Sequence, residues 1–488
     1  MAFSIRSSLG WMTLSQGGLF IIQFGASVVI ARLLTPYDMG VFAVAISIVG
    51  FLAAIRALGL SSYLVRAKSL DPGLFATAFT INAVLAAFIS VMIVGLSALG
   101  GALLHEPGVQ RLLLVMAISP LLSAFEFLPA AGLERRGSFH AIAILNLVRS
   151  LVSNAVMLAF AFAGFSYMSL AYGQLTGSLV AAIGVNLVAR RDAHFKLGLS
   201  EWKGMLSFGL QMLAISGVNV LATRLAELLL ARLLGLTALG LYSRASGLNS
   251  LLWDNVHLII ARIVFVDFSQ QKRHGGSLRG SYLRIVQMMT GLLWPAFAGL
   301  AVVAGPVIRL LYGPVWIGAA LPLSLLSISA MVLVSITMTW EVFVVCGETA
   351  RQAKFEFVRS GAGLVLFALG CLASITWVAV AKIGEALFSL FLYRPHLERM
   401  TDTVLKDFIP IYAKSSLLTM FAIAPASLIM TFNDWSAYTP MPQVIAGIVF
   451  GGVCWGFGLY LLGHPLLEEA RTILARRRKL PVVLGPED

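Results

Sequence analysis

The chain has 488 residues, of which 59% are hydrophobic and only 12% are charged. A soluble protein carries about a quarter charged residues, so this composition excludes an ordinary soluble globular protein. The formal net charge of +13 does not indicate a nucleic-acid partner, because the basic residues lie in short segments between long apolar ones.

Apolar segments of about 20 residues, separated by glycine, proline and charged residues, predict transmembrane helices along the whole chain. The sequence predicts about 14 of them, and therefore an all-α integral membrane protein. The first segment follows Arg6 and lacks a small-residue cleavage site, which favours a retained helix over a signal peptide. The predicted spans are 9–31, 39–61, 75–100, 112–132, 140–162, 167–188, 204–231, 238–261, 284–308, 317–345, 353–371, 374–393, 408–431 and 442–463.

A stretch between the first two spans recurs two hundred positions later. The first copy runs from Ala31 to Phe42 and the second from Ala231 to Tyr242, and both begin Ala-Arg-Leu-Leu. Gly40 of the first copy aligns with Gly240 of the second without a gap. This fixed offset indicates a duplicated helical bundle, with each glycine at the start of the following helix. The alternative is chance similarity between two leucine-rich helix ends.

The basic residues favour one orientation in the membrane. With a cytoplasmic N-terminus, the loops on that side carry most of the 35 Lys and Arg residues. The opposite loops carry only Arg32, Arg111, Arg232 and Arg309. This positive-inside pattern predicts that both termini are cytoplasmic. The opposite loops are also short, with about ten residues in the longest clear one, which is too few for a catalytic domain.

Polar residues inside the predicted spans recur at intervals of three and four, which places them on single helical faces. Because a charge in hydrocarbon costs several kcal/mol, these faces predict a polar cavity. The alternative is structural pairing within a helix, for which Arg224–Glu227 and Lys382–Glu385 have suitable spacing. The candidate cavity residues are Arg56, Glu126, Asn146, Arg149, Asn219, Arg224, Glu227, Arg244, Asn249, Trp253 and Asp254.

The residue types suggest the ligand of such a cavity. Arginines bind phosphate or pyrophosphate through charge-assisted hydrogen bonds, and asparagine, serine and tryptophan suit sugars. The sequence has no glycine-rich nucleotide loop, nucleophile elbow or metal-ligand spacing among its seven histidines and three cysteines. We therefore expect a transporter without a resident cofactor rather than an enzyme. The energy source is left open among a coupled proton or sodium ion, the membrane potential and consumption of the product.

Several short motifs are similar to those of a known transporter family. They include Ala31–Pro36 with Gly40 and Phe42, Gly59-Leu60 with Leu64–Arg66, Glu134–Phe139, Leu239–Ser243, Pro295, Pro306–Gly313, Trp316 and Ala319-Ala320. On these residues the chain resembles the polysaccharide-transporter family of the multidrug/oligosaccharidyl-lipid/polysaccharide exporter superfamily, over about residues 1–400. It departs at Val266-Asp267, where such proteins often have a proline, so we expect a different helix end there.

The resemblance implies two pseudo-symmetric six-helix bundles around a central V-shaped cavity that opens to each side in turn. We expect an N-terminal lobe at 1–195, a C-terminal lobe at 196–400, two additional helices at 401–465 and a basic cytoplasmic tail at 466–488.

The implied activity is a flippase in the bacterial inner membrane. Its substrate would be an undecaprenyl-pyrophosphate-linked oligosaccharide for exopolysaccharide, capsule or O-antigen synthesis. The implied partners are this substrate, membrane lipids, a polysaccharide polymerase and a chain-length regulator, with no nucleic acid and a monomeric chain.

Two other functions are considered. A cation-coupled multidrug exporter of the same superfamily would centre on carboxylates, for which Glu126, Glu227 and Asp254 are candidates. The cavity arginines argue against it, because they repel cationic drugs. A membrane polymerase or ligase of the same sugar units would need a larger outer loop than the sequence provides.

Overall fold

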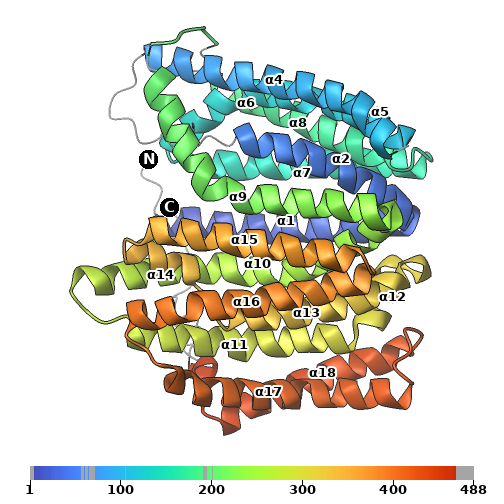
Figure 1. Ribbon diagram of the computed structural model, residues 1–488, viewed down its shortest axis with the longest axis vertical. Helices are drawn as coiled ribbons and strands as arrows, with labels where there is room; N and C mark the ends of the chain where they lie inside the picture. The colour runs from blue at the N-terminus through green and yellow to red at the C-terminus, as the bar shows by residue number, and fades with distance from the viewer. Residues whose placement is uncertain are drawn as a thin grey trace, which may run out of the picture. The chain divides into compact units, whose positions relative to one another are not determined.

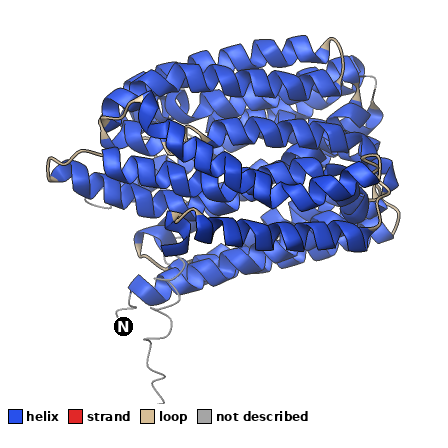
Figure 2. Cartoon of the chain, turned by 90° about the horizontal axis from the view of Figure 1, so that it is seen from below, coloured by secondary structure: helices blue, strands red, loops and turns tan. Residues whose placement is uncertain are grey.

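The computed structural model consists of helices. It describes residues 5–468 apart from 57–59, 61–63, 65–71, 105, 191–194 and 201, and within this part of the chain it contains no strand (Figure 2). Ten of the described helical segments are long and apolar enough to cross a membrane. The chain is therefore an all-α multi-pass membrane protein, and the prediction of about 14 spans is consistent with these helices.

The helices follow the predicted spans along the chain (Figure 1). In order they are α1 (Ile5–Leu33), α2 (Pro36–Arg56), α4 (Pro72–Leu104), α5 (Pro107–Met116), α6 (Ile118–Arg135), α7 (Phe139–Phe162), α8 (Met168–Val188), α9 (Trp202–Leu234), α10 (Leu236–Arg273), α11 (Arg279–Val302), α12 (Ala304–Tyr312), η2 (Pro314–Ala319), α13 (Ala320–Val334), α14 (Thr339–Val345), α15 (Thr349–Cys371), α16 (Ile375–Thr401), α17 (Leu405–Phe432) and α18 (Met441–Leu461).

Some predicted spans are interrupted in the structure. The span 112–132 consists of α5 and α6, which meet at Ala117, so that Pro120 lies in the first turn of α6, where its missing N–H removes no helical hydrogen bond. The span 317–345 consists of η2, α13 and α14, with a turn between the last two. The helix α10 continues through Val266-Asp267 to Arg273, well past the predicted end at 261.

The first of two compact units comprises residues 1–243 and 311–315. In it α7 packs along α8 and α1, while α6 packs along α4 and α8. Small residues allow the α7–α8 approach: the Oγ of Ser153 donates a hydrogen bond to the carbonyl of Gly173 at 2.8 Å. A Cβ at Gly173 would lie 2.6 Å from the Cβ of Met157, so a larger residue there would separate the two helices.

Each copy of the repeated stretch lies at the start of a helix, α2 in the first copy and α10 in the second. Thr35 and Asp38 form a capping box at the start of α2: the backbone N–H of Thr35 donates to the Asp38 carboxylate at 2.9 Å, and that of Asp38 to the Thr35 hydroxyl at 3.2 Å. In the second copy Gly235, with φ of +87°, joins α9 to α10. Gly40 and Gly240 each occupy the fifth position of the helix that follows, as the repeat predicted.

The two copies contact each other through these glycines. A Cβ built on Gly40 would lie 1.9 Å from the carbonyl oxygen of Leu236, and one on Gly240 would lie 1.8 Å from that of Pro36. Pro36 and Leu236 are themselves equivalent positions of the repeat. The contact is therefore reciprocal, as expected of two copies related by a pseudo-two-fold axis.

The second unit comprises residues 244–310 and 316–488. Here α11 packs against α13 and α17, α16 packs against α13 and α15, and α17 pairs with α18. Its core is rich in fully buried aromatic side chains: Phe268, Tyr282, Phe297 and Phe343. The predicted lobe boundaries at 195 and 400 stay a prediction, and the basic tail from residue 469 lies outside the described residues.

Candidate functional site

Arg149 and Glu126 form the first polar pair of the predicted cavity. They come from α7 and α6, with 3.6 Å between the Nη1 of Arg149 and the Oε1 of Glu126. This separation exceeds hydrogen-bond distance, and the side chains are 41% and 28% exposed. Asn146 lies one turn before Arg149 and is also exposed. The guanidinium is thus accessible and only loosely neutralised.

Arg224 and Glu227 form a tighter cluster with α2. The Nη1 of Arg224 donates to the Oε2 of Glu227 at 2.8 Å, and the hydroxyl of Ser47 donates to the same oxygen at 2.6 Å. A Cβ at Gly50 would lie 2.8 Å from the Nε of Arg224, so the arginine side chain lies directly against α2. The intrahelical pair that the sequence offered as an alternative is therefore formed in this structure.

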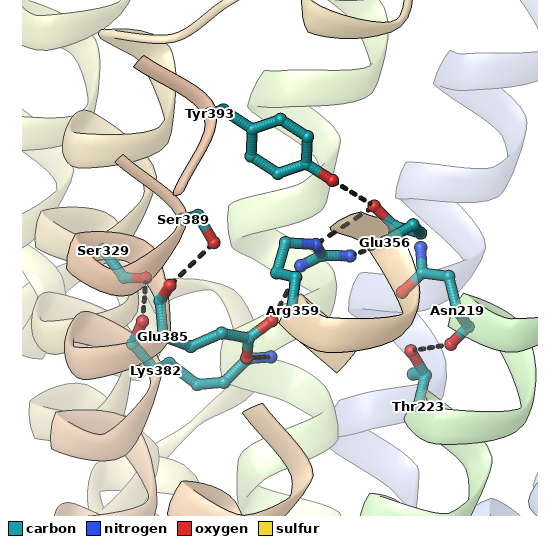
Figure 3. A network of polar contacts seen from close by, with 9 residues as sticks. All are labelled: Asn219, Thr223, Ser329, Glu356, Arg359, Lys382, Glu385, Ser389 and Tyr393. Atoms are coloured by element: carbon teal, nitrogen blue, oxygen red, sulfur yellow. Dashed lines mark hydrogen bonds and ion pairs between the residues drawn. The ribbon is translucent and has the colours of Figure 1, made fainter. Parts of the chain in front are cut away.

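Two further predicted cavity residues lie on α9 and α2. Asn219 is exposed on α9, where its carbonyl accepts a hydrogen bond from the Thr223 hydroxyl at 2.9 Å (Figure 3). Arg56 is the last residue of α2, and its side chain lies outside the described residues.

The predicted residues of α10 belong to the second unit. The guanidinium of Arg244 lies 5.6 Å from the ring centroid of Trp316, a cation–π arrangement against a buried indole. The rings of Trp253 and His257 are stacked, with centroids 5.0 Å apart and 13° between their planes. Asn249 is half-buried and Asp254 is exposed. The α10 stripe thus combines the Trp253 ring with polar groups, and its role in binding a sugar stays a prediction.

A charged network that sequence reasoning largely missed connects α15 to α16 (Figure 3). Arg359 donates to Glu385 at 2.7 Å and pairs with Glu356, and Lys382 donates to the other oxygen of Glu385 at 2.6 Å. The hydroxyl of Tyr393 donates to Glu356 at 3.0 Å. The Lys382–Glu385 pair was predicted, and the Glu356-x-x-Arg359 spacing was the available signal for the rest.

Close packing keeps this network in place. A Cβ at Gly363 would lie 2.6 Å from the carboxyl carbon of Glu385, so α15 carries a glycine where the acid approaches. The hydroxyl of Ser329 donates to the carbonyl of Lys382 at 2.8 Å, which links α13 to the same turn of α16. With two basic and two acidic members, the network is formally neutral and suited to a structural role in the membrane.

An apolar pocket of about 410 Å³ lies in the second unit, between α10, α11, α17 and α18. Its walls are almost entirely hydrocarbon, and Trp455 lies at one side, where its indole N–H donates to the carbonyl of Gly291 at 3.0 Å. Gly299 and Gly452 line the pocket, and nothing lies within 4 Å of the position that a Cβ would take on either of them. The pocket can therefore accept an apolar chain, whereas it offers few partners to a sugar or a phosphate.

Comparisons with known proteins agree with these features. The model of a family described as "Polysaccharide biosynthesis protein" matches residues 29–321. The succinoglycan biosynthesis transport protein ExoT of Rhizobium meliloti is 25% identical over 98% of this chain and 97% of its own. The teichuronic acid biosynthesis protein TuaB of Bacillus subtilis is 21% identical over 98% of both chains.

Solved structures share the fold at low sequence identity. A lipid II flippase, MurJ, in an inward closed conformation matches with a TM-score of 0.74 and 14% identity, covering 92% of this chain and 99% of that one. An inward-facing multidrug transporter of the MATE family matches with a TM-score of 0.57 and 14% identity, covering 79% of this chain and 96% of that one. Both likenesses establish the fold of the chain.

Proposed function

The chain belongs to the polysaccharide biosynthesis protein family, and from this premise we propose that it is a flippase for lipid-linked oligosaccharides. Its substrate is an undecaprenyl-pyrophosphate-linked repeat unit, carried from the cytoplasmic to the outer leaflet of the bacterial inner membrane by alternating access. The relatives named for succinoglycan transport and for teichuronic acid biosynthesis support this proposal. The positive-inside pattern supports cytoplasmic termini.

The accessible guanidinium of Arg149 is the observation that carries the proposal. Because Arg149 is only loosely paired with Glu126, it has hydrogen-bond donors available for a pyrophosphate. A neutral sugar lacks the negative charge that makes such hydrogen bonds strong. Arg224 is a second phosphate ligand once it leaves Glu227. Asn146, Asn219, Asn249 and Trp253 supply contacts for the sugars, and the apolar pocket supplies a surface for the polyprenyl chain.

The carboxylates favour this function over export of cationic drugs. Glu126 and Glu227 each lie beside an arginine in the structure, so that their negative charge is largely offset. The predicted cavity residues comprise four arginines and three acids, a set with net positive charge that favours an anionic ligand. A polysaccharide polymerase and a chain-length regulator are the partners we propose for the exported unit, and we propose that the chain acts as a monomer.

Deleting the gene in its native host tests the proposal. Cells without the chain should lose surface polymer and accumulate lipid-linked oligosaccharide in the cytoplasmic leaflet. A plasmid copy with Arg149→Ala should fail to restore export, and Arg149→Lys should restore it in part, because the bidentate fork is lost. The control is Arg111→Ala, which removes a basic residue from an exposed position at the start of a span. Normal polymer export by Arg149→Ala at wild-type abundance would remove the main support for the proposal.

A further inference from the structure

The segment from α13 to α14 is broken at a position that carries buried polar side chains. α13 ends at Val334 and α14 begins at Thr339, and between them Met338 has a φ of +58°. The left-handed region is unfavourable for methionine, so the surrounding packing must enforce this turn. Non-helical backbone at membrane depth is tolerated where it is enclosed by protein or lines a polar site.

Three buried polar atoms in this region make no hydrogen bond to any described residue: the Oε2 of Glu341, the Oγ1 of Thr337 and the Nδ1 of His257. Glu341 is 4% exposed and Thr337 is 2% exposed. Most buried polar groups in proteins are hydrogen-bonded, because an unpaired one is costly. A buried carboxylate with an unused oxygen is therefore a candidate for a functional role.

His257 approaches this carboxylate from α10. Its Nε2 lies 3.8 Å from the Oε1 of Glu341, a separation too long for a hydrogen bond and short enough for strong electrostatic interaction. Stacking on Trp253 fixes the plane of the imidazole. Asp254, one turn earlier on α10, is exposed and also interacts electrostatically with His257.

The other elements packed against α14 carry two charged clusters: the network of Arg359, and the group of Glu348, Arg351 and Arg399 just after the end of α14. Phe343 of α14 contacts Phe355 of α15 and Tyr393 of α16, with ring centroids 6.1 Å and 6.0 Å apart. Tyr393 in turn donates to Glu356, which Arg359 neutralises. Among the charged groups, His257 interacts electrostatically with Glu341, and Asp254 interacts in turn with His257.

We propose that Glu341 and His257 bind one exchangeable proton at this helix break, and that this proton is the ion coupled to transport. The second part rests on the proposed flippase function. A carboxylate at this distance stabilises the protonated form of an imidazole by its charge, so the pair can hold a proton without a direct hydrogen bond. The proton enters from one side of the membrane and leaves to the other as the site changes its exposure.

The residues fit a proton better than a metal cation. Hard cations such as sodium prefer several oxygen ligands, and an imidazole nitrogen next to one carboxylate does not provide them. Among the residues that the structure describes, no group of three or more His, Cys, Asp or Glu side chains could hold a metal ion.

Tryptophan fluorescence of the purified full-length protein in lipid vesicles tests the proton site without any substrate. Emission is recorded from about pH 5 to 8, and the signal of the Trp253→Phe variant is subtracted from that of the wild type. Protonation of the stacked imidazole quenches Trp253, so the difference signal should titrate. His257→Gln should abolish the titration, and Glu341→Gln should shift its midpoint by about one unit or more. His274→Gln, at an exposed histidine after α10, is the matched control and should change nothing.

Two results would overturn the proton site. One is a difference signal that stays the same in both His257→Gln and Glu341→Gln. The other is a midpoint that follows the sodium concentration at constant pH, which would assign the site to sodium. Where Glu341→Gln does not fold, the result for His257→Gln alone decides the proton site.

Polymer export by the same variants tests the coupling. Export should fall about tenfold or more in His257→Gln at normal abundance, as expected when one transport step loses about 1.4 kcal/mol. Wild-type export by a variant that has lost the titration would overturn the coupling. If the titration holds but deletion of the gene leaves polymer export intact, the proton site stands and the proposed flippase function fails.

Discussion

The hydroxyl of Ser47 and the carboxylate of Glu227 are 180 positions apart in the sequence and joined by a hydrogen bond of 2.6 Å. Through this bond α2 holds the acid that also binds Arg224. Of the two arrangements that the sequence left open for Arg224, the structure contains the structural pair, and the role in a ligand cavity stays a prediction. Arg224 is paired in this conformation, and it is a phosphate ligand only if the substrate displaces Glu227.

A double-mutant cycle separates the two roles of Arg224. We expect Arg224→Ala to lower polymer export about tenfold or more, because a charge-assisted ligand is worth about 1.5–3 kcal/mol. The Arg224→Ala, Glu227→Ala double variant should remain as defective as Arg224→Ala, since neither can bind pyrophosphate. Restored export in the double variant would show that Arg224 only neutralises Glu227. Export is measured as surface polymer at matched protein abundance.

The reciprocal glycine contact predicts a large loss of stability. Gly40→Ala and Gly240→Ala each force a methyl group into a backbone carbonyl, at a cost of about 3 kcal/mol. The melting temperature of the purified protein in detergent should fall in each variant. The double variant should be less destabilised than the sum of the two, because one separation of α2 from α10 relieves both clashes.

Gly247→Ala is the control for these glycines. It lies on α10 with nothing within 4 Å of its Cβ position, so it should leave the melting temperature unchanged or slightly raised. Gly40→Ala and Gly240→Ala proteins as stable as the wild type would exclude the close approach of the two repeated stretches.

Filling the apolar pocket should impair transport without unfolding the protein. Gly452 lines the pocket and nothing lies within 4 Å of its Cβ position, so we expect Gly452→Leu to lower export severalfold at an unchanged melting temperature. Gly456→Leu, one turn further along α18, also has open space but does not line the pocket. Equal export by the two variants would argue against a role of the pocket in binding the polyprenyl chain.

The orientation in the membrane is tested by labelling single cysteines in a variant without Cys346, Cys371 and Cys454. A cysteine at Asn433, after α17, should react with a membrane-impermeant thiol reagent added to intact cells. Cysteines at Arg190 and Arg273 should react only after the cells are broken. Labelling at Arg190 from outside would reverse the proposed topology.

The sequence predicted those features that depend on local pattern. Apolar length placed the helices, the fixed offset placed Gly40 and Gly240, and i to i+3 spacing gave the Arg224–Glu227 and Lys382–Glu385 pairs, all of which the structure contains.

Contacts between distant helices were not predictable from one sequence. The bond from Ser47 to Glu227, the approach of His257 to Glu341 and the pairing of Arg359 with Glu385 each need the packed arrangement of two helices. The break before α14 was also missed, since Ser335–Met338 contains neither glycine nor proline, the usual signals of a turn.

The neutrality of the Arg359 network has an electrical consequence. Moving one elementary charge through a membrane potential of about 100 mV takes or releases about 2.3 kcal/mol. The positive charges of Arg359 and Lys382 cancel the negative charges of Glu356 and Glu385, which lie within hydrogen-bond distance. These four side chains together therefore carry no net charge through the membrane potential. Displacement of this part of α15 and α16 then does no electrical work. Under the proposed function, the voltage dependence of transport would come instead from the charges of the pyrophosphate and of the coupled proton.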